Sequence, residues 1–314
     1  MKKLFAITII VYFTVALAIM LVAFLSRGES WPPMIFALTL LIPLYLWVKD
    51  YSGRIKLSDK VGKKSIGVVA GWALMLFLLA LLVRIPSVLM FNMPYEKTPL
   101  IYLLTLTIVL VEKKELSVFG FKTHRMIKAL LYGVVYFAIL QGTILLVHCF
   151  MVYFIMNQMV FSSFDVAFFL LSMPFQTLLV GVSEEGLFRG YIQTSIEQFG
   201  VLKAVLFQAA LFGLWHFVWD LSPFNLFGML RYITITFLFG LLFGYFYAKT
   251  RNLVPLILVH GLWNSFQSGI ITNTEVLDKL AQATFLTQFS AWFLPYIIAV
   301  PAVLAFTKYC VKEI

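Results

Sequence analysis

Long apolar runs follow one another along the whole chain, and short polar segments separate them. A helix needs roughly 17 to 25 apolar residues to cross a bilayer, and most of the runs approach or exceed that length. The pattern predicts an all-α fold, a polytopic transmembrane helix bundle of about eight to ten spans, the lower counts applying because two runs are short. The candidate spans are residues 4–25, 33–48, 67–83, 99–111, 129–156, 165–197, 201–220, 226–248, 253–271 and 285–308.

The composition agrees with a membrane protein. Of the 314 residues, 62% are hydrophobic and only 12% are charged, which excludes a soluble globular protein. The first apolar run follows Met-Lys-Lys, as in a signal peptide, but it is longer than the apolar region of one and lacks a convincing small-residue cleavage site. We therefore expect this run to be retained as a membrane anchor.

Basic residues are unevenly distributed among the polar segments. If the N-terminus is cytoplasmic, 18 of the 24 Lys and Arg residues fall at cytoplasmic ends of the candidate spans, and the opposite side holds only Arg27, Arg84, Lys97 and Lys279. Because basic residues near span ends stay in the cytoplasm, both termini are expected there. Attraction to the anionic inner leaflet explains the net charge of +10 without a nucleic-acid partner. The short loops are typical of a bacterial cell membrane protein.

Ionisable side chains inside the apolar runs are the candidates for function. A charge at membrane depth costs several kcal/mol on most estimates, and such residues usually face the bundle interior or a wet cavity. Because most of them lie between residues 184 and 264, we interpret residues 1–128 as N-terminal scaffold helices and residues 129–314 as the core that carries the candidate site. The candidates for chemistry are Glu184, Glu185, Arg189, His216, His260 and the strongly polar Asn264.

The adjacent residues Glu184 and Glu185 are predicted to differ in role. Glu185 and Arg189 are four residues apart, so in a helix they share a face and form an ion pair. Glu184 is rotated by about 100° from that face, which leaves it without this partner and free to accept a proton. The structural alternative is a buried salt bridge beside one protonated carboxyl group.

The segment lengths predict that three helices bring the candidates to one region. If the chain turns near residue 200, Glu184 and His216 lie about 21 and 23 Å from that turn, at 1.5 Å per residue. His260 and Asn264 lie about 11 and 17 Å from the next turn on the same side. Because these two residues are four apart, they share a helix face.

The polar residues of the apolar runs form three short motifs. They are EExxxR at Glu184, Glu185 and Arg189, FxxxH at Phe212 and His216, and HxxxN at His260 and Asn264. In this order, spacing and apolar context, the set resembles that of the CPBP family, the CAAX-protease and bacteriocin-processing membrane proteins. This family, also called the ABI family, includes the type II CAAX prenyl endopeptidases. The resemblance covers roughly residues 165 to 271 and extends to the pieces SEEGLFRGYI, ALFGLWH and LVPLILVHGLWN.

The resemblance implies an all-helical intramembrane peptidase with a chamber open to the cytosol. It implies Glu184 as the general base that activates water and His216 as a residue that helps to hold this water. His260 and Asn264 would then stabilise the oxyanion of the tetrahedral intermediate. Amide hydrolysis needs such a base and such donors, and a dry site strengthens both.

The substrate is implied only by class. Glu185 with Arg189 would brace the helix or help to bind a membrane-associated protein, a lipidated protein or a peptide. The other expected partners are membrane lipids. In a bacterium a regulated peptide or bacteriocin is an alternative to a prenylated CAAX protein.

Peptide hydrolysis at these residues could proceed with or without a metal ion. Members of the family are commonly labelled metalloproteases, and Glu184, His216 and His260 from different helices could hold a catalytic zinc ion with an open position. The HExxH pattern of helix-borne zinc sites is absent from the sequence. A metal-free glutamate mechanism uses the same residues, so both forms stay open.

Two other functions are compatible with buried polar residues. A catalytically idle relative could be a membrane scaffold or a bacteriocin-immunity-type protein that binds a partner, although every catalytic position of the motifs is occupied. A transporter or proton relay would also use buried Glu and His. A transporter is expected to have matched broken helices in its two halves, whereas the polar residues here crowd into one half.

Overall fold

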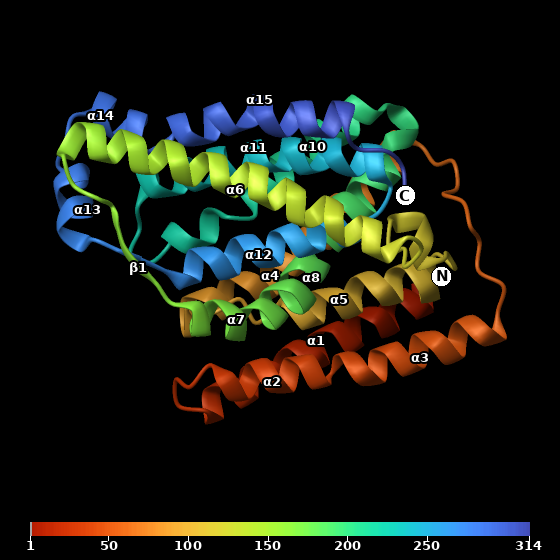
Figure 1. Ribbon diagram of the computed structural model, residues 1–314. Coiled ribbons are helices and arrows are strands. Elements are labelled where there is room, and N and C mark those ends of the chain that lie inside the picture. Colours follow the sequence, from red (N-terminus) through yellow and green to blue (C-terminus); the bar gives the residue numbers. More distant parts are fainter. Residues whose placement is uncertain (1) are drawn as a thin grey trace.

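Eight helices among residues 2–314, the part that the computed structural model describes, are long and apolar enough to cross a membrane. The chain is thus an integral, multi-pass membrane protein, and the predicted all-α bundle is confirmed (Figure 1). The spanning helices are Lys2–Leu25, Trp31–Arg54, Ile66–Phe91, Met126–Met156, Val166–Phe199, Val201–Asp220, Leu226–Thr250 and Phe285–Tyr309.

Several spans consist of more than one helical element. The α-helices are α1 (Lys2–Leu25), α2 (Trp31–Thr39), α3 (Leu41–Arg54), α4 (Ile66–Phe91), α5 (Lys97–Leu106), α6 (Met126–Met156), α7 (Val166–Phe175), α8 (Val182–Glu185), α9 (Thr194–Ile196), α10 (Val201–Leu214), α11 (Leu226–Thr250), α12 (Val254–Gly269), α13 (Thr274–Ala281), α14 (Phe285–Trp292) and α15 (Leu294–Tyr309). The two short strands β1 (Phe161–Phe164) and β2 (Ile270–Thr272) pair in antiparallel orientation.

Two of the ten candidate spans are too short to qualify as spanning helices. The run 99–111 forms α5 and a π-helical turn, together Lys97–Val111, and the run 253–271 forms the 16-residue α12. Nearly every residue of α5 is buried, and a helix that is apolar on all sides is expected to be surrounded by protein. The count of eight therefore lies at the lower limit of the prediction.

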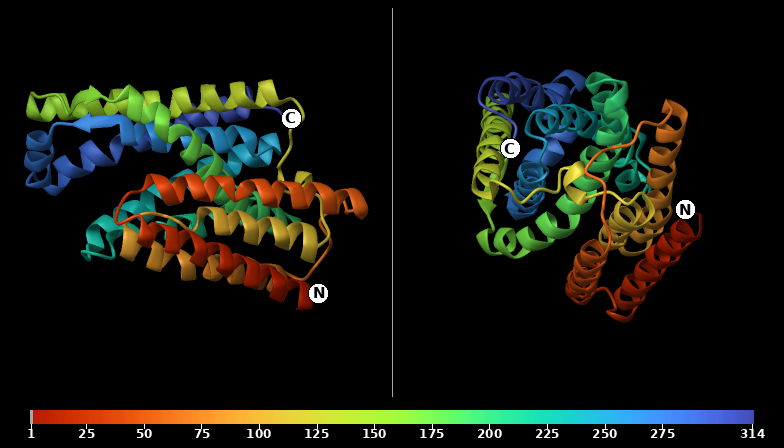
Figure 2. Two further views of the ribbon diagram at one scale, coloured as in Figure 1. Left: turned by 90° about the horizontal axis from the view of Figure 1, so that it is seen from below. Right: turned by 90° about the vertical axis from the view of Figure 1, so that its right-hand side faces the viewer.

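The helices form two groups with α12 between them. Figures 1 and 2 show α1 to α3 and α5 in one group and α6, α11 and α15 in the other. α1 packs on α5, α10 packs on α11, and α6 packs on both α12 and α15. α12 also contacts α7 and the π-helical segment that follows α7. α12 is therefore packed between α6 and this span.

The span Val166–Phe199 changes its helical form twice. A π-helical segment, Gln176–Gly181, follows α7, and another, Gly186–Gln193, follows the short α8. π-Helical turns in α-helices occur frequently at functional sites. Glu184 and Glu185 occupy the single α-helical turn between the two π-helical segments.

Two glycines allow α12 to approach this span closely. A Cβ atom at Gly181 would lie 2.7 Å from the carbonyl oxygen of Ile257, and one at Gly261 would collide with the side chain and backbone of Thr177. Small residues allow helices in membranes to approach one another in this way. The contact places His260, the neighbour of Gly261, against the helix turn that carries both glutamates.

Candidate active site

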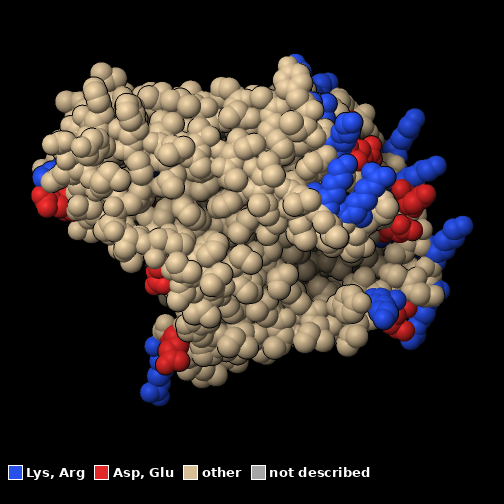
Figure 3. All heavy atoms as spheres, in the orientation of Figure 1, with Lys and Arg blue, Asp and Glu red and all other residues tan. Residues whose placement is uncertain are grey.

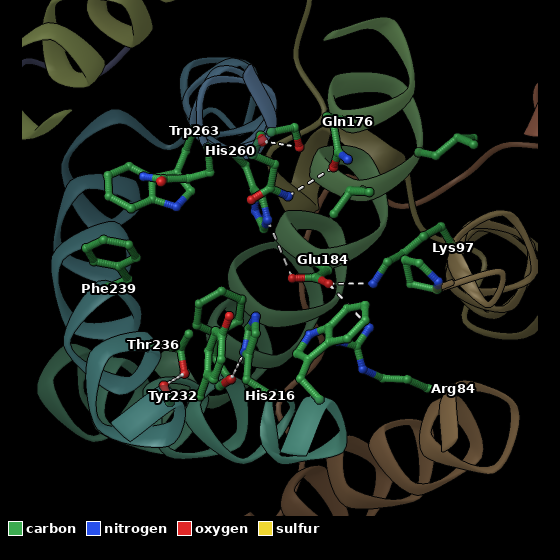
Figure 4. Close-up of a pocket in the computed structure, with 18 of the residues that line it drawn as sticks. Arg84, Lys97, Gln176, Glu184, His216, Tyr232, Thr236, Phe239, His260 and Trp263 are labelled. Atoms are coloured by element: carbon green, nitrogen blue, oxygen red, sulfur yellow. Dashed lines mark hydrogen bonds and ion pairs between the residues drawn. The ribbon is translucent and has the colours of Figure 1, made fainter. Parts of the chain in front are cut away.

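A cavity of about 630 Å³ lies inside the bundle. Its lining includes Glu184 from α8, His216 from the end of α10, and His260 and Asn264 from α12 (Figure 4). A volume of several hundred Å³ with a few convergent polar groups is typical of a binding site. The predicted meeting of three helices around these residues is therefore confirmed.

Glu184 is buried and forms no ion pair with Arg189, as predicted, but it has two cationic partners from other helices that were not predicted. Oε1 of Glu184 lies 2.5 Å from Nζ of Lys97 and accepts a hydrogen bond of 2.8 Å from the indole N–H of Trp215. A guanidinium nitrogen of Arg84 lies 3.8 Å from the same oxygen. The prediction considered only ion pairs within the same helix and therefore did not include cations from other helices.

Three charged residues of the N-terminal half complete this cluster. Oε1 of Glu96 accepts a hydrogen bond of 2.5 Å from Nη1 of Arg84 and lies 2.6 Å from Nζ of Lys97. The exposed fraction is 1% for Arg84, 0% for Glu96 and 3% for Lys97. With Glu184 they form a buried group of two acids and two bases. The expectation that Arg84 and Lys97 lie in polar segments is thus wrong, because both belong to helices and their side chains are buried in the bundle.

A signal for these residues was present in the sequence. Arg84 lies seven residues before the end of α4, inside an apolar run, and Lys97 is the first residue of a helix that is otherwise apolar. A charge in either place requires a partner. Counting basic residues by polar segment alone assigned both of them to the wrong environment.

The ion pair between Glu185 and Arg189 is confirmed. Nη1 of Arg189 donates to Oε1 of Glu185 at 3.1 Å, and both residues are fully buried. The guanidinium carbon of Arg189 also lies 4.1 Å from the ring centre of Phe212 and 5.1 Å from that of Phe243. Neither Glu185 nor Arg189 lines the cavity, so the pair lies in the packed interior behind the cavity wall.

His260 lies between the two glutamates. Its Nδ1 is 2.7 Å from Oε1 of Glu185, and its Nε2 is 3.6 Å from Oε2 of Glu184. Both ring nitrogens therefore face carboxylate oxygens. The bond to Glu185, which is itself held by Arg189, fixes the orientation of the ring.

His216 and Asn264 are each held by one polar contact. Nδ1 of His216 lies 2.8 Å from the carbonyl oxygen of Phe212, and because a carbonyl only accepts, Nδ1 carries a proton and leaves Nε2 free. His216 follows the last turn of α10, where the helix unwinds, and does not lie within the helix as expected. The amide nitrogen of Asn264 donates to Gln176 at 3.1 Å. Gln176 was not identified from the sequence, although it is a polar residue inside an apolar run.

One oxygen of Glu184 has no hydrogen-bond partner among residues 2–314. Oε1 is engaged by Lys97 and Trp215, whereas Oε2 is buried and orphaned on the side of His260. A buried acceptor without a partner costs about 1–3 kcal/mol. The site therefore offers an acceptor that a water molecule or a substrate group can satisfy.

The donor set fits a zinc ion poorly in this arrangement. Among the described residues, no three His, Cys, Asp or Glu side chains are grouped in a way that could hold a metal ion. Glu184, the only acid among the three expected ligands, already has Lys97 at 2.5 Å and Arg84 at 3.8 Å, and these cations would repel a dication. The residues present therefore do not fit a zinc ion.

Aromatic side chains line much of the remaining cavity wall. Phe239, Trp219 and Trp263 contribute to it, and Tyr95 lies in the segment between α4 and α5. Burial raises the pKa of Tyr95, so this phenol remains neutral and can donate a hydrogen bond at physiological pH. The wall suits an apolar or aromatic guest, with the polar groups gathered at Glu184.

A family comparison matches the part of the chain that carries the three motifs. The model described as type II CAAX prenyl endopeptidase Rce1-like matches residues 166–266. No curated protein and no solved structure matches the chain. The matched segment contains all six residues that the motifs contributed as candidates, but not Arg84, Glu96 or Lys97. The match at residues 166–266 therefore supports the assignment of this segment to the CAAX protease family, as its motifs indicated.

Proposed function

We propose that the protein is an intramembrane endopeptidase that hydrolyses a peptide bond of a membrane-associated, lipidated or peptide substrate. The observation that carries this proposal is the orphaned Oε2 of Glu184, buried beside His260 at the wall of the cavity. Orphaned buried polar groups in native proteins require an explanation. Glu96 and Glu185 each have an orphaned oxygen as well, but of these three acids only Glu184 lines the cavity. An acceptor reserved for the attacking water explains this one.

Glu184 is proposed as the general base. Its Oε2 accepts the proton of a water molecule while the water oxygen attacks the carbonyl carbon of the scissile peptide bond. His216, whose Nε2 is free, helps to hold this water. When the tetrahedral intermediate collapses, the C–N bond breaks, and Glu184 returns the proton to the leaving amine. The products are a carboxylic acid and an amine, and the base is regenerated.

His260 and Asn264 are proposed to stabilise the oxyanion. They lie one helical turn apart on α12, and both line the cavity. The contact with Glu185 holds the ring of His260, and Gln176 holds the amide of Asn264. Donors that are fixed before the reaction stabilise developing charge without reorganisation, and removal of one such donor typically costs 10²–10³-fold in rate.

Lys97 and Trp215 are proposed to position the base. Both engage Oε1 of Glu184, which orients the carboxylate and leaves only Oε2 for water. A general base must be ionised, and the adjacent ammonium group stabilises that form. Arg84 and Glu96 hold the ammonium group in place through the buried cluster. This set of contacts supports a metal-free glutamate mechanism.

Comparison of membrane peptides tests the proposed function. Cells that carry the native chain are compared with cells that carry Glu184→Gln, which keeps the shape of the side chain but removes its basicity. We expect peptide fragments that occur only with the native chain. His124→Ala, in an exposed part of the basic loop before α6, is the control and should give the native fragments.

The same cleavage is then repeated in isolated membranes with a chelator. The metal-free form of the mechanism predicts an unchanged rate, whereas loss of cleavage and its recovery on addition of zinc would favour the metal form. Identical peptides with the native chain and Glu184→Gln would favour a scaffold or immunity role and contradict the proposal.

A further inference from the structure

The two ends of the bundle differ strongly in charge. Figure 3 shows most of the Lys and Arg side chains gathered at one end, near both termini, with few at the other. We call the first the basic end; it contains the start of α4, the end of α11 and the tail after α15. The opposite end holds Arg27 and Lys279, and Lys279 lies 2.6 Å from Glu275. The basic residues at the basic end are Lys2, Lys3, Lys49, Arg54, Lys56, Lys60, Lys63, Lys64, Lys113, Lys114, Lys122, Arg125, Lys128, Lys203, Lys249, Arg251, Lys308 and Lys312.

The cavity reaches the surface at the opposite end. Four of the residues that line it are exposed, and we call them the mouth: Asn92, Tyr232, Gln267 and Ser268. Asn92 follows the last residue of α4, Tyr232 lies in the first third of α11, and the other two lie in the last turn of α12. α4 begins at the basic end, and α11 ends there, so the mouth lies far from the basic end.

Packed side chains close the cavity toward the basic end. On the span that carries Glu184, the next residues toward the basic end include Leu187, Phe188 and Tyr191, all at most 2% exposed. Phe246 and Leu253 are also fully buried and belong to the same apolar cluster. The hydroxyl group of Tyr191 donates a hydrogen bond of 2.7 Å to Glu112, which connects this layer to the loop that follows Val111. A substrate from this side would have to displace the layer.

We propose that the chamber opens to the non-cytoplasmic side and takes its substrate from there. Basic residues near span ends remain in the cytoplasm, which assigns the basic end to the cytoplasm and the mouth to the other side. The inference rests on the proposed function and specifies its substrate: a peptide segment at the outer membrane surface, apolar or aromatic beside the scissile bond. A lipidated C-terminus at the cytoplasmic surface does not reach the chamber. The proposed direction of opening is the opposite of the cytosol-open chamber that the family resemblance implies.

Cysteine labelling in sealed vesicles tests the direction of opening. Cys149→Ala and Cys310→Ser remove the native thiols, and Ser268→Cys then places one at the mouth. Ser65→Cys, at the exposed start of α4, places the same substitution at the basic end. A charged, membrane-impermeant maleimide is added to right-side-out and to inverted vesicles. We expect Ser268→Cys to react at least tenfold faster in right-side-out vesicles and Ser65→Cys to show the opposite ratio.

Every other pattern of labelling overturns the proposal. Faster reaction of Ser268→Cys in inverted vesicles would place the mouth in the cytoplasm. No reaction in either preparation, even in detergent, would mean that the mouth is closed. If Ser268→Cys does not accumulate, Gln267→Cys takes its place, because this neighbouring residue is also exposed at the mouth. The labelling needs no catalysis, so Glu184→Gln should give the same pattern even if the protein is not a peptidase.

A second arm tests the substrate class. One reporter peptide, taken from the fragments that depend on Glu184, is fused to a membrane anchor that presents it either outside or inside. We expect cleavage of the outward-facing reporter only. Equal cleavage of both reporters would overturn the inference, and cleavage of neither would contradict the proposed function instead.

Discussion

The two oxygens of the Glu184 carboxylate have different surroundings. Oε1 faces the ammonium group of Lys97 and the indole N–H of Trp215, whereas Oε2 is orphaned beside His260. A carboxylate held in this way is oriented and available on one side only. These are the properties that a general base for water requires.

The role of Lys97 can be separated from that of substrate binding. Lys97→Met removes the ammonium group that orients Glu184, and we expect kcat to fall by about 10²-fold, at the lower end of what acid–base catalysis contributes. KM should change little, because Lys97 acts through Glu184. Lys97→Arg keeps a cation and should recover part of the rate. A native kcat for Lys97→Met in folded protein would remove this residue from the mechanism.

Loss of the buried partner of Arg189 should affect the amount of folded protein. Glu185→Ala strands a guanidinium group at depth, and breaking a buried pair typically costs about 3–5 kcal/mol. We expect a marked fall in the quantity of protein recovered in mild detergent and in its melting temperature. His260 would also lose the contact that holds its ring.

Glu275→Ala is the matched control for this change. Glu275 pairs with Lys279 at the same spacing of four residues on α13, but both side chains of this pair are exposed. Exposed pairs contribute about 0–1 kcal/mol, so little change is expected. Equal effects of the two substitutions would show that burial of the Glu185–Arg189 pair has no particular importance.

At the residue scale, the sequence predicted the part of the site that forms short motifs. Glu184, His216, His260 and Asn264 could be found because each is a polar residue inside an apolar run. Lys97 could not be linked to Glu184, because their contact joins residues 87 positions apart. Pairing across such a distance depends on how the helices pack, which spacing along one helix does not reveal.

At the element scale, the site depends on the close approach of α12 to the span that carries Glu184. Gly181 and Gly261 leave room for the opposite backbone at this crossing. The approach brings His260 within 2.7 Å of Glu185 and leaves its other ring nitrogen 3.6 Å from Glu184. A shift of α12 would lengthen both distances together.

A single methyl group at this crossing should therefore reduce activity. Gly261→Ala places a Cβ atom within 2.8 Å of three atoms of Thr177, including a backbone atom, so α12 must move. We expect kcat to fall at least tenfold and the melting temperature to fall as well. Gly142→Ala on α6 is the control, since no atom lies within 4 Å of its added Cβ. A fully active Gly261→Ala variant would mean that the position of α12 is not critical.

The sequence predicted the helices themselves better than their surroundings. Hydropathy located every spanning helix, because the length of an apolar run reports directly on the thickness of the bilayer. It also suggested spans at α5 and α12, which are apolar because protein surrounds them rather than lipid. Local pattern did not predict the unwinding of α10 before His216 or the π-helical segments on both sides of Glu184.

At the scale of the whole molecule, a charged end, a packed layer and a chamber follow one another along the bundle. The charge of the basic end was evident from the sequence, but which end the chamber faces was not. That property depends on the buried layer around Phe188 and Tyr191 and on the exposed residues of the mouth. Both result from packing between helices that are distant in the sequence.

The most direct test of the account is the rate at which purified Glu184→Gln cleaves a peptide that the native protein cleaves. The amide cannot take a proton from water, so we predict a fall in kcat of about 10²–10⁴-fold, with the melting temperature and substrate binding retained. Cleavage at the native rate by folded Glu184→Gln would contradict the assignment of Glu184 as the base and, with it, the proposed active site.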